Sequence, residues 1–138
     1  MYYKCRHFNI KELVDKKTFA RFGEDAWMFF NPMALRMLDA LRDYFATTVT
    51  VNDWPFGGKN QYRGFRPPGC KIGAEFSQHK RGAAFDISVK GFTAETVREE
   101  ILTHKDTYFP QITCLEGEIP WVHFDCRNIP DRIRIVYP

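Results

Sequence analysis

The chain has 138 residues, of which 44% are hydrophobic and 27% are charged. This balance excludes a disordered polar chain and a membrane protein, and the length predicts a single domain, residues 1–138, with its own core. The net charge is only +3 and the lysines and arginines are scattered, so we expect no nucleic-acid partner.

The first part of the chain predicts two helices. Residues 10–22 have the amphipathic pattern of a helix that ends before Gly23. Asn31 and Pro32 supply an N-cap and a first-turn proline, so a second helix begins there. Apolar residues then recur at near-helical spacing with charged residues largely opposite, which predicts a surface helix packed on a sheet. The apolar positions are Met33, Leu35, Leu38, Leu41 and Phe45, and the charged positions are Arg36, Asp39, Arg42 and Asp43.

Alternating and β-branched stretches predict strands at residues 47–51, 83–89, 111–116, 121–126 and 132–137. Residues 52–70 are rich in glycine, proline and asparagine, and their aromatic and arginine side chains predict a long functional loop. Thr93 caps a further helix that extends to about residue 104. The predicted fold class is α+β, with N-terminal helices packed on a largely antiparallel sheet.

The N-terminus shows no apolar run of signal-peptide length, and no membrane span follows. We therefore expect synthesis in the cytoplasm without a signal peptide and no insertion into a membrane. The cysteines show no C-x-x-C spacing, which favours reduced, mostly buried thiols over a disulfide pair. They are Cys5, Cys70, Cys114 and Cys126.

Two histidines and an aspartate form a candidate metal site. Asp86 falls within an apolar strand pattern, where its charge needs an ion pair or a metal to compensate it. His79 precedes Gly82, a flexible point that can bring the imidazole back over the end of that strand. His123 lies in an alternating strand whose other face is apolar, so its side chain turns into the cleft. Each residue alone is more often a solvated or paired polar residue. Three ligands of this kind with a fourth position left to water are typical of catalytic zinc.

The same residues carry a resemblance to a known family. The pattern Ser77-x-His79-x-x-Gly82-x-Ala84-x-Asp86, followed by Trp121-x-His123, resembles the zinc D-alanyl-D-alanine carboxypeptidases and L-alanyl-D-glutamate endopeptidases. These are cell-wall peptidases of bacteria and bacteriophage endolysins, and they share a fold with the hedgehog signalling domain. The stretch Gly64-Phe65-Arg66-Pro67 is similar to the Gly-aromatic-Arg segment of this family. The resemblance implies that one zinc ion is bound by His79, Asp86 and His123.

The resemblance also implies a carboxylate base shortly before the last histidine, which takes a proton from water and passes it to the leaving amine. Pro120 stands three positions before His123, so a Glu-x-x-His arrangement is absent. Glu116 is our first choice for the base and Glu118 the second. Asp125 is a distant third, because it is better suited to supporting a ligand.

Other residues are expected to bind substrate. Arg66 would hold the substrate carbonyl or terminal carboxylate and stabilise the developing oxyanion, and Arg63 in the same loop is its rival. Ser77 and Gln78 would shape their turn and contact the substrate. Trp121 would form a wall of the cleft.

These expectations describe a zinc metallopeptidase that cuts stem peptides or cross-bridges of peptidoglycan. We expect a monomeric phage lysin, made in the host cytoplasm and acting on the cell wall. One alternative is a non-catalytic binding or structural module that keeps the fold and the zinc. Another is a dipeptidase for free D-Ala-D-Ala. The pattern does not distinguish which bond is cut.

Overall fold

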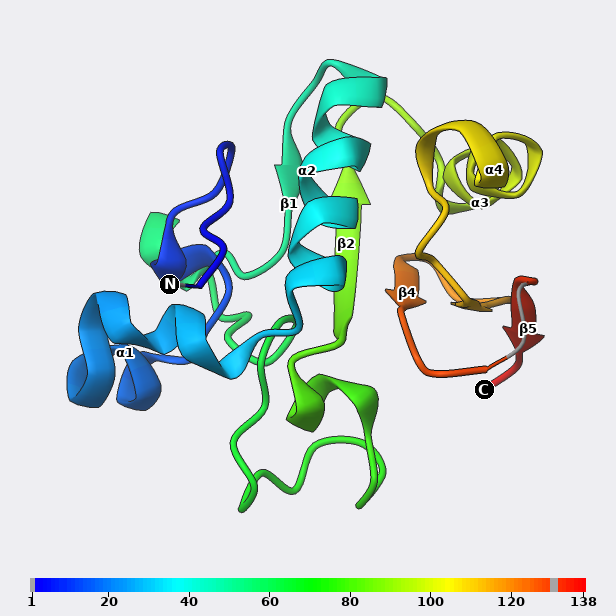
Figure 1. Cartoon of the computed structure of the whole chain (residues 1–138). Coiled ribbons are helices and arrows are strands. Elements are labelled where there is room, and N and C mark those ends of the chain that lie inside the picture. The colour runs from blue at the N-terminus through cyan, green and yellow to red at the C-terminus, as the bar shows by residue number, and fades with distance from the viewer. Residues whose placement is uncertain (1, 130–131) are drawn as a thin grey trace.

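The computed structural model describes residues 2–129 and 132–138 (Figure 1). Its helices are α1 (Lys16–Phe22), α2 (Pro32–Phe45), α3 (Ala94–Thr103) and α4 (Lys105–Tyr108). Its strands are β1 (Val49–Thr50), β2 (Ala84–Val89), β3 (Cys114–Glu116), β4 (Val122–Asp125) and β5 (Arg134–Val136). Short 3₁₀ turns occur at Ile10–Glu12, Gly23–Phe29, Trp54–Phe56 and Gln78–Arg81. The fold is therefore α+β.

The five strands form one sheet in the order β1-β2-β4-β3-β5. Three pairings are antiparallel, but β5 runs parallel to β3, so the sheet is mixed rather than simply antiparallel. The reason is topological. The chain reverses after β3 to form β4 and reverses again before β5, which then pairs with the outer edge of β3.

None of the helices in residues 2–129 and 132–138 is long and apolar enough to cross a bilayer.

Helix α2 packs beside β2 and begins as predicted (Figure 1). The Oδ1 atom of Asn31 accepts a hydrogen bond from the N–H of Met33 at 2.9 Å, and Pro32 occupies the first turn. Most of the predicted apolar face is buried, and with Phe85 and Phe124 of the sheet it forms the core. Met33 is an exception, because it lies in the first turn and is 39% exposed.

Asp39 was predicted on the exposed face of this helix but is buried. The N-terminal segment crosses that face, and its polar groups converge on the carboxylate. Oδ2 accepts from Tyr3 Oη at 2.7 Å and from the N–H of Arg6 at 2.9 Å, and Oδ1 accepts from the N–H of His7 at 3.2 Å. The carboxylate therefore ties residues 3–7 to α2.

We expect Asp39→Ala to lower the free energy of unfolding by roughly 1–3 kcal/mol, because three part-buried donors lose their shared, buried acceptor. Chemical denaturation measures this loss. Asp43→Ala is the matched control on the same helix, since its half-exposed carboxylate pairs with Arg6 and His7. This variant should cost no more than about 1 kcal/mol, as exposed pairs do. Equal losses in both variants would show that the three part-buried hydrogen bonds of Asp39 add no stability beyond that of an exposed ion pair.

The helix predicted over residues 10–22 is interrupted, so that prediction is wrong in its middle. The buried carboxylate of Asp15 caps α1 by accepting from the N–H of Thr18 at 3.1 Å and from its Oγ1 at 2.6 Å. Ahead of this cap, the carbonyl of Val14 accepts from Trp54 Nε1 at 2.8 Å. The carbonyl of Leu13 accepts from the N–H of Phe65 at 2.8 Å. The break thus frees backbone acceptors that hold the loop of residues 52–70.

This loop follows a defined path against β2, with one 3₁₀ turn at Trp54–Phe56. The carbonyl of Arg63 accepts from the N–H of Asp86 at 2.8 Å. At Gly64, a Cβ atom would overlap the carbonyl of Leu13, so only glycine fits there. The glycine of the Gly-aromatic-Arg segment is thus a requirement of close backbone packing, and it brings the loop to the candidate site.

Candidate metal centre

Three elements bring His79, Asp86 and His123 together. His79 lies on the turn Gln78–Arg81, while Asp86 and His123 face each other as register partners of β2 and β4. All three are buried, with exposed fractions of 2%, 7% and 8%. One potential ligand atom from each lies within 4.8 Å of the other two, so the group could hold a metal ion.

The turn that presents His79 depends on its two ends. The hydroxyl of Ser77 accepts from the N–H of His79 at 3.2 Å and so caps the turn. At its other end Gly82 has φ 65°, and a Cβ atom there would overlap the carbonyl of Phe29. The N–H of Asn31 donates to the carbonyl of Gly82 at 3.0 Å. Glycine is thus needed both for the left-handed conformation and for close packing against the start of α2.

Hydrogen bonds on the outer sides of the two imidazoles determine which nitrogens can bind a metal. His79 Nδ1 lies 2.9 Å from the carbonyl of Gly64, an acceptor that requires a proton on this nitrogen. His123 Nε2 lies 2.8 Å from Asp125 Oδ2, which requires the same. In the neutral imidazoles, the nitrogens left with lone pairs are therefore His79 Nε2 and His123 Nδ1, which lie 3.3 and 2.9 Å from Asp86 Oδ1. Fixing of the outer nitrogen is the usual arrangement of metal-binding histidines.

The pKa values of His123 and Asp86 indicate that the site favours a positive charge. Burial alone would lower the pKa of His123, but hydrogen bonds to Asp125 and Asp86 and their charges raise it to about 9. Burial would likewise raise the pKa of Asp86, yet hydrogen bonds from the two histidines and their charges hold it well below its usual range. Without a metal, a proton on His123 therefore compensates the carboxylates that face it. The set of two nitrogen donors and one carboxylate therefore fits a divalent metal that replaces a proton.

A cleft of about 480 Å³ opens over this group. Of the residues predicted to act on substrate, it brings together five: Arg66, Ser77, Gln78, Glu116 and Trp121. It does not include Arg63, whose guanidinium lies 5.8 Å from the ring centre of Trp121. It does not include Glu118 or Asp125 either.

Glu116 is positioned by strand register. It faces His123 across β3 and β4, just as Asp86 faces His123 across β2 and β4. The three side chains thus form one row across the sheet, at the short cross-strand spacing of directly paired residues. Glu118 is exposed and has φ 59°, a left-handed conformation outside the strand. The structure therefore places Glu116, rather than Glu118, beside the metal group.

Arg66 contacts the group from the loop of residues 52–70. Its Nε donates to the carbonyl of Tyr62 at 2.8 Å, and its Nη2 lies 3.3 Å from Asp86 Oδ2. Gly73 lies directly against the guanidinium, so that a Cβ atom there would overlap Arg66 Nη1. Arg66 is thus held at the cleft by contacts on two sides.

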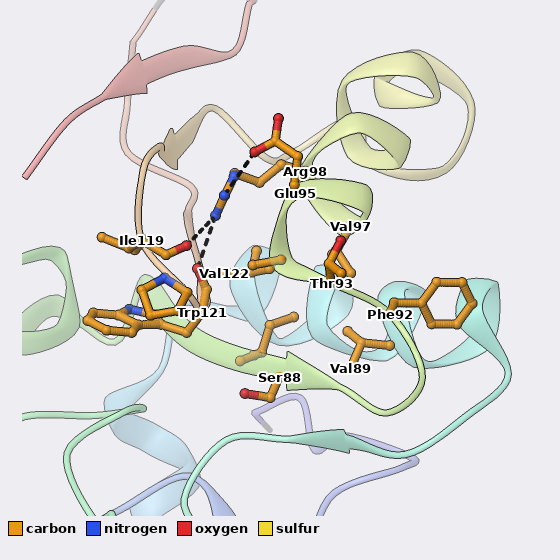
Figure 2. A pocket seen from close by; sticks show the side chains of 13 residues that line it. Ser88, Val89, Phe92, Thr93, Glu95, Val97, Arg98, Ile119, Trp121 and Val122 are labelled. Atoms are coloured by element: carbon orange, nitrogen blue, oxygen red, sulfur yellow. Dashed lines mark hydrogen bonds and ion pairs between the residues drawn. The ribbon is translucent and has the colours of Figure 1, made fainter.

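The β3–β4 connection is anchored by Arg98, a buried arginine of α3 (Figure 2). Its Nη1 donates to the carbonyls of Ile119 at 3.2 Å and Trp121 at 3.1 Å, and its Nη2 lies 3.3 Å from Glu95. These bonds hold the segment between Glu116 and the strand of His123. A second pocket of about 460 Å³ adjoins this segment, and Trp121 lines both it and the cleft.

Two residues near the site were missed or given little weight in the sequence analysis: Arg127 had no predicted role, and Asp125 was only a third choice for the base. Asp125 is fully buried behind His123, and Arg127 pairs with it through two nitrogens at 2.8 and 2.7 Å. Arg127 also lines the cleft. The signal that could have identified it is an arginine two residues after a buried aspartate, which needs a cation nearby. All four cysteines are free thiols; Cys114 and Cys126 are buried, whereas Cys5 and Cys70 are half-buried.

Comparison with known proteins adds no family assignment. No protein-family model matches this chain, and neither curated proteins nor solved structures give a significant match. The chemistry of the site therefore has to be argued from its own residues.

Proposed function

We propose that the protein is a zinc-dependent peptidase of peptidoglycan, of the D-Ala-D-Ala carboxypeptidase or L-Ala-D-Glu endopeptidase type, with their hedgehog-like fold. The observation that carries the proposal is the buried group of His79, Asp86 and His123 at the base of an open cleft. Two imidazole nitrogens and one carboxylate leave a tetrahedral zinc with one open position, as catalytic rather than structural sites do.

The residues around this group suit hydrolysis of an amide. A zinc ion would activate a water molecule and polarise the scissile carbonyl. Glu116, in the same row of the sheet, accepts the proton of the attacking water and returns it to the leaving amine. Arg66 donates to the carbonyl oxygen as negative charge develops on it. Ser77, Gln78 and Trp121 line the same cleft and contact the peptide.

The substrate class comes from the sequence resemblance, and the cleft is compatible with it. A peptide with a free or developing carboxylate suits a cleft that contains Arg66 and Arg127. In the proposed setting the protein is a phage lysin that reaches the cell wall after synthesis in the host cytoplasm.

Purified peptidoglycan tests this proposal. We expect the zinc-loaded protein to clear a suspension of the polymer and to release stem-peptide fragments identifiable by mass spectrometry. A chelator should stop the reaction and added zinc should restore it. Stoichiometric zinc with the polymer and its peptides left intact would instead identify a binding or structural module. Cleavage of free D-Ala-D-Ala alone would identify a dipeptidase.

A further inference from the structure

Arg127 lines the cleft, and hydrogen bonds of both its side chain and its backbone hold it in place. Its Nε and Nη2 bind the two oxygens of Asp125 at 2.8 and 2.7 Å, and its N–H lies 3.2 Å from Asp125 Oδ1. Its carbonyl accepts from Thr113 Oγ1 at 2.7 Å, which ties it to the segment before β3. The side chain is 27% exposed, whereas the Asp125 side chain is completely buried.

The carboxylate of Asp125 links this arginine to the metal group. Its Oδ2 accepts from both Arg127 Nη2 and His123 Nε2, at 2.7 and 2.8 Å. Because both oxygens are held by the guanidinium, Asp125 cannot rotate away from the imidazole. Without Arg127, the buried carboxylate would lose the guanidinium that pairs with both of its oxygens, and it would reorient toward solvent.

We propose that Arg127 is a positioning residue of the metal centre: it holds Asp125 as an oriented acceptor, and Asp125 in turn holds the His123 ring with Nδ1 toward Asp86. This inference rests on the metal site of the proposed function, but not on hydrolysis. It predicts that Arg127 affects metal affinity in the absence of any substrate. A role limited to binding substrate would change the KM for peptide and leave metal affinity unchanged.

A double-mutant cycle on metal affinity tests the inference. The dissociation constant of zinc would be measured by competition with a chelating indicator for the wild type, Arg127→Gln, Asp125→Asn and the double variant. We expect Arg127→Gln to weaken zinc binding by about 10–100-fold, as loss of a residue that orients a ligand does. The double variant should bind zinc no more weakly than Asp125→Asn alone, because both changes break the same chain of contacts. Arg134→Gln, at an exposed arginine of β5, is the matched control and should bind like the wild type.

The absorption spectrum of the cobalt-loaded proteins reports the geometry of the metal site, which a general loss of stability would not change. We expect the cobalt bands of Arg127→Gln to shift relative to the wild type, because the His123 ring changes orientation. If Arg127→Gln does not fold, Arg127→Lys keeps the charge but loses the two-pronged contact, and it should bind zinc more weakly than the wild type. Wild-type affinity in a folded Arg127 variant would overturn the inference, as would effects that multiply in the double variant. A wild type that binds no divalent ion would overturn the proposed function as well.

Discussion

Replacing His123 with alanine is expected to weaken zinc binding by more than about 100-fold, since loss of a ligand should exceed the loss of a residue that merely orients one. Hydrolysis of peptidoglycan should disappear with the metal. His123 Nδ1 is one of only two nitrogens in the buried group, and the remaining pair, His79 and Asp86, cannot complete a tetrahedral site. Zinc content after dialysis and clearing of the polymer measure the two effects together.

His104→Ala is the matched control for this change. His104 pairs with Glu100 on α3, away from the cleft, so its loss should alter neither zinc content nor activity. Thermal unfolding of the metal-free proteins separates loss of ligand from loss of fold. A folded His123→Ala protein that keeps stoichiometric zinc would show that the metal is bound elsewhere.

The elements that could be predicted from the sequence are those specified by local signals. Asn31 and Pro32 begin α2 as expected, and Thr93 caps α3. The apolar runs of β2 and β4 are also where alternation places them. The three residues of the candidate metal group could be identified for the same reason, because a charged or imidazole side chain inside an apolar strand or beside a glycine turn needs a partner.

What could not be predicted depends on segments distant in the sequence. Asp39 is buried because residues 3–7 pack over it. The helix break before Asp15 frees the carbonyl of Val14 to accept from Trp54, forty residues later. The partners of the outer imidazole nitrogens include the carbonyl of Gly64, which carries no side-chain signal. The row that places Glu116 beside His123 depends on strand register, and a shift of one residue would turn Glu116 to the other face.

Glu116→Gln is expected to reduce hydrolysis of peptidoglycan by about 10²–10⁴-fold while zinc remains bound, because the amide cannot accept the proton of the attacking water. Glu116 is not among the three residues of the metal group, but it lines the same cleft. The change from carboxylate to amide keeps the shape of the side chain, so the cross-strand contact with His123 is preserved. Initial rates on a soluble stem peptide, with zinc content measured on each sample, give the comparison.

Glu118→Gln is the control that makes this result specific. In a continuous strand, residues 116 and 118 would share a face, so alternation alone could not choose between the two glutamates. The backbone distinguishes the two residues, because β3 ends at Glu116 and Glu118 adopts a left-handed conformation outside the strand. The intervening Gly117 passes close to the ring of Tyr137, which a Cβ atom at this position would overlap. Glu118→Gln should therefore keep near-wild-type rates. If instead it loses activity and Glu116→Gln does not, the base acts from outside the sheet row. If both variants stay active and retain zinc, proton transfer does not depend on this segment.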